Sequence, residues 1–495
     1  MLSVLLMVVL GAITYCYLRR HYSYWSRKGI TGPRPIFLLG NIAPSITGKK
    51  SVGDIVTEIY NEYKGNPIVG FYRTVTPCLL VRDLNLIKDI TVKDFKHFEN
   101  NDIHIERKSD RIFGSHPFCL KGNEWKNCRK ELTHSFTSGK MKLIFPMLEE
   151  NGQKMVKSIC STTVNEISVL EAKKLCSKFT LENVNACAFG MDSQCFRKTE
   201  PMDMRMAYGL VKTGSWGVYK YFLSTIIPRI HKVLNIRIVN STYGNELLHM
   251  IHAFMSYRVK SGVVRNDFLD SMVQLKENAP SNGFDILALG ANFFVDGYET
   301  SSTVMALLLF ELAMHKEVQN KLRSEIRQSK ELSGGKLSCE VVQSMRYLDA
   351  CFNENLRVHS IVSTLGKTCT KSYTYHLKHR NTSVVIEKGT PIIIPISAIH
   401  HDPQYFENPI HFCPERFLEK KTLQKYTFMP FGEGPRSCLG KRFGVLQIKV
   451  GVIDIISNFE LSVNEKTELP LKYNPWFFVV APTKGIWINA KKILE

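Results

Sequence analysis

Apolar residues in this chain mostly follow helical spacing, but two stretches are apolar on nearly every side. Met1 to Leu18 has no charged side chain, and Arg19 and Arg20 follow it. At ~1.5 Å per residue, about 18 residues span ~27 Å, so this stretch predicts a helix that crosses a thin bilayer. The second stretch, Phe284 to His315, contains no proline. It predicts a long helix buried in the middle of the protein.

The remaining pattern indicates further helices and a few short strands. A helical segment near residues 52–63 precedes two strand-like runs, PIVGFY and PCLLV. Residues 141–280 consist of amphipathic helical stretches separated by short polar loops, and the sequence shows no internal repeat. The spacing of RFGVLQIKVGVIDII predicts another helix, and the C-terminal tail predicts strands.

The N-terminal stretch is interpreted as an uncleaved anchor, the alternative being a signal peptide. A signal peptide would carry a basic leading region and a small-x-small cleavage site, and this stretch has no such leading region and a poor cleavage pattern. The basic residues after it hold that side in the cytosol. Pro33 and Pro35 stiffen the following segment. We expect an anchor over 1–18, a basic, proline-rich hinge over 19–50 and a catalytic domain over 51–495.

Charge and cysteine usage narrow the choice of partners. The net charge is +20 and the pI about 9.3, yet no nucleic-acid-binding motif or basic low-complexity run is present. An anionic membrane surface and an acidic protein partner fit this charge better than nucleic acid. The 13 cysteines follow no spacing pattern, which argues against a disulfide framework and favours a reducing compartment.

The most informative local pattern surrounds Cys438, in a loop that contains Phe431, Gly432, Gly434, Arg436 and Gly440. Glycines around one thiol suggest a backbone that turns tightly and comes close to a flat ligand. A helix start just after Cys438 predicts a lowered thiol pKa. Because no second cysteine stands at C-x-x-C spacing, one axial bond to iron suits this thiolate better than zinc or a disulfide.

Polar residues in the middle of the long buried helix are the second chemical signal. Asp296 and Glu299 place two carboxylates where burial costs several kcal/mol unless they are satisfied. Gly297 removes a side chain where we expect a ligand to approach. Earlier in the chain, Trp125 and Arg129 stand four residues apart and project from one helical face, where they suit carboxylate groups or form a surface cation–π pair.

These motifs together resemble the cytochrome P450 superfamily, the haem-thiolate monooxygenases, and specifically microsomal members such as those of insects. Phe431, Gly434, Arg436, Cys438 and Gly440 match its haem-binding loop, and Gly297, Glu299 and Thr300 match its oxygen-activating motif. The resemblance implies one large haem domain, mainly α-helical with small β-sheets, behind an N-terminal membrane anchor.

The resemblance also implies roles for individual residues. The cofactor is haem b (iron protoporphyrin IX), and Cys438 is its metal ligand. Glu354, Arg357 and Arg416 form a structural ion network. Lys367 occupies a position where the family has an arginine, so its contact with a haem propionate cannot be bidentate. The expected cofactor-binding residues are Trp125, Arg129, Lys367, Phe431, Arg436 and Gly440, and the expected catalytic residues are Glu299, Thr300 and Asp296.

Asp296 departs from the alanine that is usual in this motif. In a fatty-acid-hydroxylating branch of this family, the same position carries a glutamate that can be esterified to a haem methyl. For Asp296 three outcomes stay open: it forms the ester, it acts as an extra acid in the proton relay, or it turns away and bonds within its own helix. Because aspartate is one methylene shorter than glutamate, a polar, pocket-shaping role is favoured over the ester.

The implied reaction inserts one oxygen atom of O2 into a lipophilic small molecule, such as a xenobiotic, a hormone or a fatty-acid-like compound. Electrons come from NADPH through a separate NADPH-cytochrome reductase, with a cytochrome b-type protein as a further donor. The expected location is the endoplasmic reticulum membrane with the catalytic domain facing the cytosol. Two alternatives stay open: a haem-thiolate isomerase or dehydratase, and a non-catalytic haem-binding protein at the membrane.

Basic residues flank the two elements next to Cys438. They are Lys126, Lys130, Lys441, Arg442 and Lys449. We expect them to dock acidic residues of the reductase.

Overall fold

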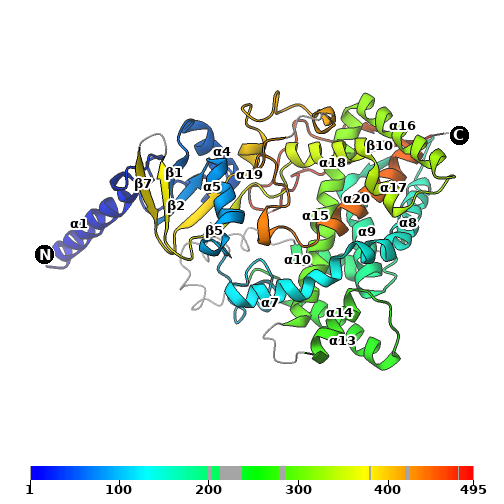
Figure 1. Ribbon diagram of the computed structural model, residues 1–495, viewed down its shortest axis with the longest axis horizontal. Coiled ribbons are helices and arrows are strands. Elements are labelled where there is room, and N and C mark those ends of the chain that lie inside the picture. Colours follow the sequence, from blue (N-terminus) through cyan, green and yellow to red (C-terminus); the bar gives the residue numbers. More distant parts are fainter. Residues whose placement is uncertain are drawn as a thin grey trace.

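The computed structural model describes residues 2–197, 202–211, 237–278, 285–377, 381–418, 423–477 and 479–493. Helices fill most of the molecule, while the larger sheet lies toward the N-terminal helix (Figure 1). The fold is therefore mainly α with small β-sheets, as predicted. The α-helices of the described residues are α1 (Leu2–Tyr22), α2 (Tyr24–Arg27), α3 (Ala43–Ile46), α4 (Val52–Glu62), α5 (Leu84–Lys88), α6 (Arg111–Gly114), α7 (Gly122–Thr133), α8 (Ser138–Cys160), α9 (Ala172–Val184), α10 (Met202–Val211), α13 (Ser241–Ser261), α14 (Phe268–Asn278), α15 (Ile286–Met314), α16 (Lys316–Leu332), α17 (Cys339–Ser344), α18 (Arg346–Val358), α19 (Ile396–His400) and α20 (Lys441–Asn458).

The strands form three separate sheets. The largest has the order β1-β2-β8-β5-β3, a second has the order β4-β10-β9, and β6 pairs with β7. Most neighbours are antiparallel, but β2 and β8 run parallel. The strands are β1 (Ile68–Arg73), β2 (Thr76–Val81), β3 (Asn100–Asn101), β4 (Ile167–Glu171), β5 (Leu365–Thr368), β6 (Tyr373–Leu377), β7 (Thr382–Ile386), β8 (Pro391–Ile394), β9 (Phe459–Val463) and β10 (Trp487–Lys492).

Helix α15 runs through the centre of the helical part, as the apolar pattern predicted. Its most extensive packing is against α9 and α20, and Leu307, Leu308 and Leu309 are fully buried. The Asp285 side chain caps its start by accepting a hydrogen bond from the Ala288 amide at 3.1 Å. A central helix that is buried on nearly all sides fixes the position of every side chain along it.

Helix α1 is the element that leaves the body of the protein. Among the described residues it is the one helix that is long and apolar enough to cross a membrane, over Ser3–Tyr22, and only 6% of that window is buried. Its last turn carries Arg19, Arg20 and His21. Figure 1 shows it projecting beyond the sheet-rich end. The helix is therefore a candidate membrane anchor.

The contact between α20 and α8 contains a carboxyl group without a partner. Asp454 on α20 faces Gly152 on α8 so closely that a Cβ on Gly152 would lie 1.7 Å from its Oδ2. That oxygen is buried and has no hydrogen bond among the described residues. Burial raises the pKa of Asp454 to about 7, and the charge of Glu149 adds to the rise against that of Lys330. The fold therefore favours the protonated carboxyl.

We predict that Asp454→Asn stabilises the protein at pH 8. Because the pKa in the folded state exceeds that of an unfolded aspartate, the native state binds the proton more tightly, and stability falls as pH rises from about 4 to about 7. Asparagine removes this loss, and we expect a gain of about 1–2 kcal/mol above pH 7 that vanishes below pH 4. The measurement is the thermal unfolding midpoint of both proteins across this pH range.

Glu465→Gln, which removes a charge from an exposed position, is the control. A gain in Asp454→Asn that is the same at pH 4 and pH 8 would contradict the proposed protonation.

Candidate active site

The loop before α20 holds Cys438 in a fixed backbone conformation. The Cys438 amide donates to the Phe431 carbonyl at 2.8 Å, and Gly432 and Gly434 adopt φ values of 69° and 71°. A Cβ on Gly434 would lie 1.9 Å from the Thr91 carbonyl oxygen, so only glycine fits there. At Gly440, by contrast, a Cβ would meet nothing within 4 Å. The loop is thus tight on one side and open beside the thiol, where a flat ligand needs room.

Cys438 lies just before α20, which packs against α15. The Cys438 side chain is exposed to solvent, but the protein atoms around it still desolvate the thiolate. This desolvation raises the pKa of the thiol, and the charge of Asp296 on α15 adds to the rise. The Gly440 amide and Arg129 act in the opposite direction. The predicted lowering of the thiol pKa is therefore wrong for the free thiol, because desolvation outweighs the helix end. Bonding to a metal cation, which deprotonates a coordinating thiol outright, overcomes this cost.

The carboxylates of α15 are satisfied in different ways. Glu299 pairs with Lys173 of α9, whose Nζ lies 3.0 Å from its Oε2 and also donates to Ser302 Oγ at 2.5 Å. The side chain of Asp296 is 56% exposed and lies 2.7 Å from His116 Nε2. The expectation that Asp296 bonds within its own helix is wrong. Its partner comes from the segment after α6.

Thr300 and Gly297, which neighbour Glu299 and Asp296 in the sequence, also lie in the middle of α15. Thr300 Oγ1 donates to the Asp296 carbonyl at 2.8 Å, which places its hydroxyl beside Asp296. A Cβ on Gly297 would lie 2.8 Å from Val184 Cγ2 of α9. The expectation that Gly297 makes room for a ligand is therefore wrong. Its glycine allows α9 and α15 to approach closely.

Three cations gather beside the Cys438 loop. Burial lowers the pKa of Lys367 to about 7, and the nearby charge of Arg436 lowers it further. Burial also lowers the pKa of Arg436 to about 9, with Arg129 contributing and Glu99 opposing. Lys367 Nζ donates to Asn101 Oδ1 at 2.9 Å, and Arg129 donates to the Ser437 carbonyl at 2.6 Å. No carboxylate of the described residues forms an ion pair with any of the three.

Trp125 belongs to this cation cluster. It is 4% exposed, and the Arg436 guanidinium lies 3.9 Å from its ring centroid. Trp125 and Arg129 therefore stand on one face of α7 as predicted, but the cation over the tryptophan is Arg436. Lys367 is buried, and Arg129 and Arg436 are half-buried. Positive charge that is shielded from water and has no carboxylate partner suits a ligand that brings its own carboxylates. Together with the open space at Gly440 and the single thiol, these residues fit a haem with two propionates.

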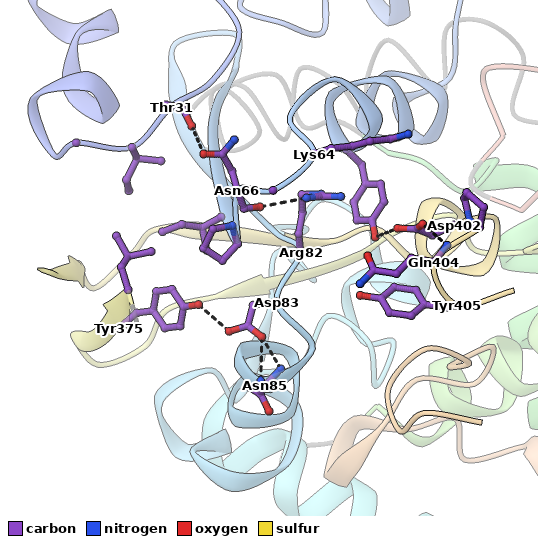
Figure 2. A pocket seen from close by; sticks show the side chains of 18 residues that line it. Thr31, Lys64, Asn66, Arg82, Asp83, Asn85, Tyr375, Asp402, Gln404 and Tyr405 are labelled. Atoms are coloured by element: carbon purple, nitrogen blue, oxygen red, sulfur yellow. Dashed lines mark hydrogen bonds between the residues drawn. The ribbon is translucent and has the colours of Figure 1, made fainter. Parts of the chain in front are cut away.

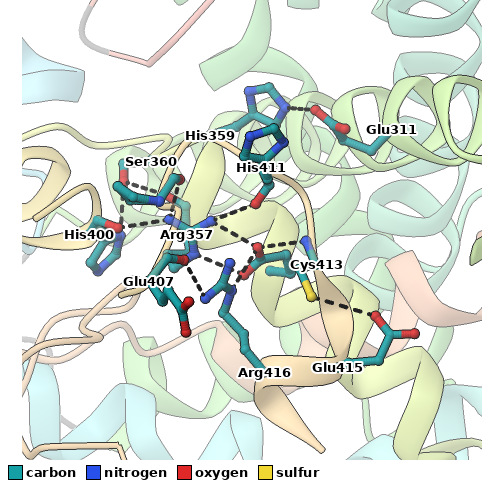
Figure 3. A network of polar contacts seen from close by, with 12 residues as sticks. Glu311, Arg357, His359, Ser360, His400, Glu407, His411, Cys413, Glu415 and Arg416 are labelled. Carbon is teal, nitrogen blue, oxygen red and sulfur yellow. Dashed lines mark hydrogen bonds and ion pairs between the residues drawn. The ribbon is translucent and has the colours of Figure 1, made fainter. Parts of the chain in front are cut away.

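Glu354, Arg357 and Arg416 come together in a buried network, and Figure 3 shows Arg357 and Arg416 within it. Arg357 and Glu354 are fully buried, and the two side chains form two hydrogen bonds of 2.8 Å. Arg416 Nε donates to Glu354 Oε1 at 3.0 Å. The remaining donors of Arg357 go to the carbonyls of His400, Pro409 and His411. Every contact is internal, which agrees with a structural role.

A cavity of about 550 Å³ lies elsewhere, between the hinge, α4 and β6 (Figure 2). Its polar groups largely satisfy each other: Tyr60 donates to Asp402 at 2.6 Å, and Tyr375 donates to Asp83 at 2.7 Å. None of the predicted site residues lines it. It is separate from the site at Cys438.

Sequence reasoning missed two residues of the site, His116 and Lys173. His116 lies 180 positions before Asp296, and Lys173 lies 126 positions before Glu299. Neither belongs to a motif with a fixed spacing, so no signal in the sequence singled them out.

Comparison with known proteins agrees with this geometry. The family model described as "Cytochrome P450" matches residues 30–489. The chain is 34% identical over 496 residues to "Probable cytochrome P450 6a13" of Drosophila melanogaster, with 99% of each chain covered. It is 31% identical to "Cytochrome P450 6j1" of Blattella germanica, over 97% of this chain and 95% of that one. It is also 31% identical to "Cytochrome P450 6B2" of Helicoverpa armigera, over 97% and 96%.

Members of this family bind haem b and act as monooxygenases. The chain has this fold, matches the family model over almost its whole length, and has a haem-compatible site around Cys438. The chain therefore belongs to the cytochrome P450 family.

Proposed function

We propose that this protein is a membrane-anchored monooxygenase that inserts one oxygen atom of O2 into a lipophilic small molecule, using NADPH electrons from a separate reductase. The observation that carries the proposal is the loop that holds the Cys438 thiol just before α20, which packs against α15, beside three cations that form no ion pair with a carboxylate of the described residues. Haem, when bound, supplies the oxygen activation and the electron transfer.

The residues around the site have separate tasks in this proposal. Cys438 would provide the thiolate that binds the iron. Trp125, Arg129, Lys367 and Arg436 would hold the propionates, with Lys367 acting as a point charge. Gly440 leaves the ring room to approach, and Phe431 fixes the loop through its carbonyl, which accepts from the Cys438 amide.

In this proposal the residues that deliver protons, Thr300 and Glu299, lie on α15. The Thr300 hydroxyl holds a proton near the substrate, at Oγ1, and is restrained by its 2.8 Å bond to the Asp296 carbonyl. Glu299, the preceding residue, supplies protons to this point, and Lys173 keeps it in place at 3.0 Å. Asp296 shapes the pocket beside them. The ester between Asp296 and a haem methyl stays an open alternative, which the shorter reach of aspartate disfavours.

The anchor sets the location. Helix α1 supports insertion into the endoplasmic reticulum membrane, and its basic last turn keeps the body on the cytosolic side. We retain the division into an anchor over 1–18, a hinge over 19–50 and a catalytic domain over 51–495.

The proposal is tested with purified protein in lipid nanodiscs. When labelled O2, NADPH and a microsomal reductase are supplied, the protein should form a product that carries one labelled oxygen atom, and formation of this product should require O2. Turnover of organic peroxides without reductase or O2 would indicate an isomerase or dehydratase instead.

We predict that Cys438→Ser yields a haem-poor or inactive protein. A serine hydroxyl ionises far less readily than a thiol and is a poor donor to iron. The measurement is the absorption spectrum of the reduced, carbon monoxide-bound protein, in which a thiolate ligand gives a red-shifted Soret band. Cys160→Ser, at a partly exposed thiol at the end of α8, is the control and should keep this band. A red-shifted band in Cys438→Ser would show that another residue is the ligand.

The proposed reductase-docking surface consists of Lys126, Lys130, Lys441 and Arg442. All four are exposed, and Lys126 pairs with Glu99 at 2.9 Å. Lys449 was expected to join them, but it is only 2% exposed and pairs with Asp349 at 2.7 Å. It therefore cannot meet a partner protein.

We predict that Lys130→Glu combined with Lys441→Glu slows reduction by the reductase about tenfold at low salt, because it reverses charge that steers an acidic partner. The measurement is stopped-flow reduction of the haem at several salt concentrations, alongside substrate affinity, which should not change. Lys64→Glu, on the loop after α4, is the matched control. Equal loss of reduction rate and substrate affinity would count against a docking role.

A further inference from the structure

The middle of α15 presents a charged carboxylate that no cation of the described residues neutralises. Asp296 is 56% exposed although it lies on a largely buried helix, with Phe294 and Tyr298 almost fully buried on either side. It lies on the side of α15 next to the Cys438 loop, because its partner His116 belongs to the segment that Arg436 of that loop holds. A substrate bound on this side of α15 therefore meets a carboxylate.

His116 is the one side chain of the described residues that bonds to this carboxylate. Its Nε2 lies 2.7 Å from Asp296 Oδ2, and its Nδ1 accepts a hydrogen bond from the Phe118 amide at 2.9 Å. Because Nδ1 is an acceptor, the ring hydrogen stands on Nε2, and the imidazole is a neutral donor. His116 thus orients the carboxylate without cancelling its charge, and it leaves Oδ1 free to accept from a ligand.

The segment that carries His116 is fixed to α15. Asn292 Nδ2 donates to the Ile112 carbonyl at 2.9 Å, and Arg111 Nη2 donates to Asp285 Oδ1 at 3.1 Å. With Asp296, these contacts lie along one face of the helix. The carboxylate is therefore held in place.

The other end of the segment is fixed to the Cys438 loop. Arg436 donates to the carbonyls of Pro117 at 3.0 Å and Leu120 at 2.8 Å. Both sides of the site thus hold His116 in position.

The surroundings of this pair are apolar. The rings of Phe113 and Phe118 lie 5.7 Å and 6.3 Å from the His116 ring. The cations beside the Cys438 loop, Arg129, Lys367 and Arg436, are the proposed partners of the haem propionates and leave no charge for Asp296. A neutral lipophile that fills the space removes water from Oδ1 and gives nothing in return, which is costly for a carboxylate.

We propose that Asp296, oriented by His116, selects lipophilic substrates that carry a cationic nitrogen. Such a molecule replaces the lost water with its own charge, and the neighbouring aromatic rings favour an alkylammonium group. The inference rests on the proposed function, since it names the substrate class of the same site.

The test compares matched ligands that differ only in charge. One is a phenylbutyl chain that ends in trimethylammonium, and its partner is the same chain ending in tert-butyl, with further pairs of other linker lengths. Neither end group bonds to haem iron. Binding is measured by equilibrium dialysis against the haem-loaded full chain in nanodiscs of zwitterionic lipid, with empty nanodiscs subtracted. We expect the charged member to bind about ten- to a hundredfold more tightly in at least one pair.

Asp296→Asn identifies the residue responsible. The amide oxygen still accepts from His116, so the segment stays in place while the charge is lost. We expect the preference to fall to about twofold or less. Glu317→Gln, at an exposed position on α16, removes the same charge elsewhere and should keep the preference.

The outcomes separate this inference from the proposed function. The inference is overturned if the charged ligand binds more tightly in none of the pairs. It is also overturned if Asp296→Asn keeps the preference unchanged. Both results count even if the red-shifted Soret band and NADPH-dependent turnover are present. The comparison of ligands on the unmodified protein decides the matter if Asp296→Asn does not fold. Loss of the Soret band in the unmodified protein would instead count against the proposed function.

Discussion

The half-buried guanidinium of Arg436 connects the parts of the site. It stacks on Trp125 of α7 and donates to the carbonyls of Glu99, Pro117 and Leu120, while its own backbone belongs to the Cys438 loop. Burial costs this cation enough to lower its pKa to about 9. Carbonyl oxygens compensate the charge only in part, so the fold gathers positive charge here that it does not balance alone. Carboxylates brought by a ligand would complete that balance, which couples cofactor binding to the stability of this region.

How far the site was predictable depended on the separation of its parts in the sequence. The Cys438 loop, α20 and α15 were predictable because each is a local pattern of glycines or apolar spacing. Lys367 and Asn101 lie 266 positions apart and meet because β5 pairs with β3. Lys173 reaches Glu299 because α9 packs along α15. Such contacts follow from topology, and neither residue alone carries a signal for its partner.

The wrong expectations share one cause. The lowered pKa of Cys438 was inferred from the start of α20, yet burial by the whole protein has the larger effect. The space at Gly297 was inferred from the absence of a side chain, and Val184 of a neighbouring helix occupies it. Lys449 was counted as surface charge from its basic neighbours, but its position on α20 turns it inward. In each case local reasoning identified the residue correctly and could not see what packs against it.

The two carboxylates of α15 show how packing divides chemically similar groups. Glu299 receives a cation from α9, and on the side of α20 Gln447 donates to the Gly297 carbonyl and to Ser301 Oγ. The polar groups of the helix thus have partners where the helix meets protein, and Glu299 forms an ion pair with Lys173. Asp296, three residues earlier, receives only a neutral imidazole. If the substrate binds at this point of the helix, as we propose, the charge of Asp296 lies against it, and an unbalanced charge among apolar groups discriminates between ligands more sharply than apolar contacts do.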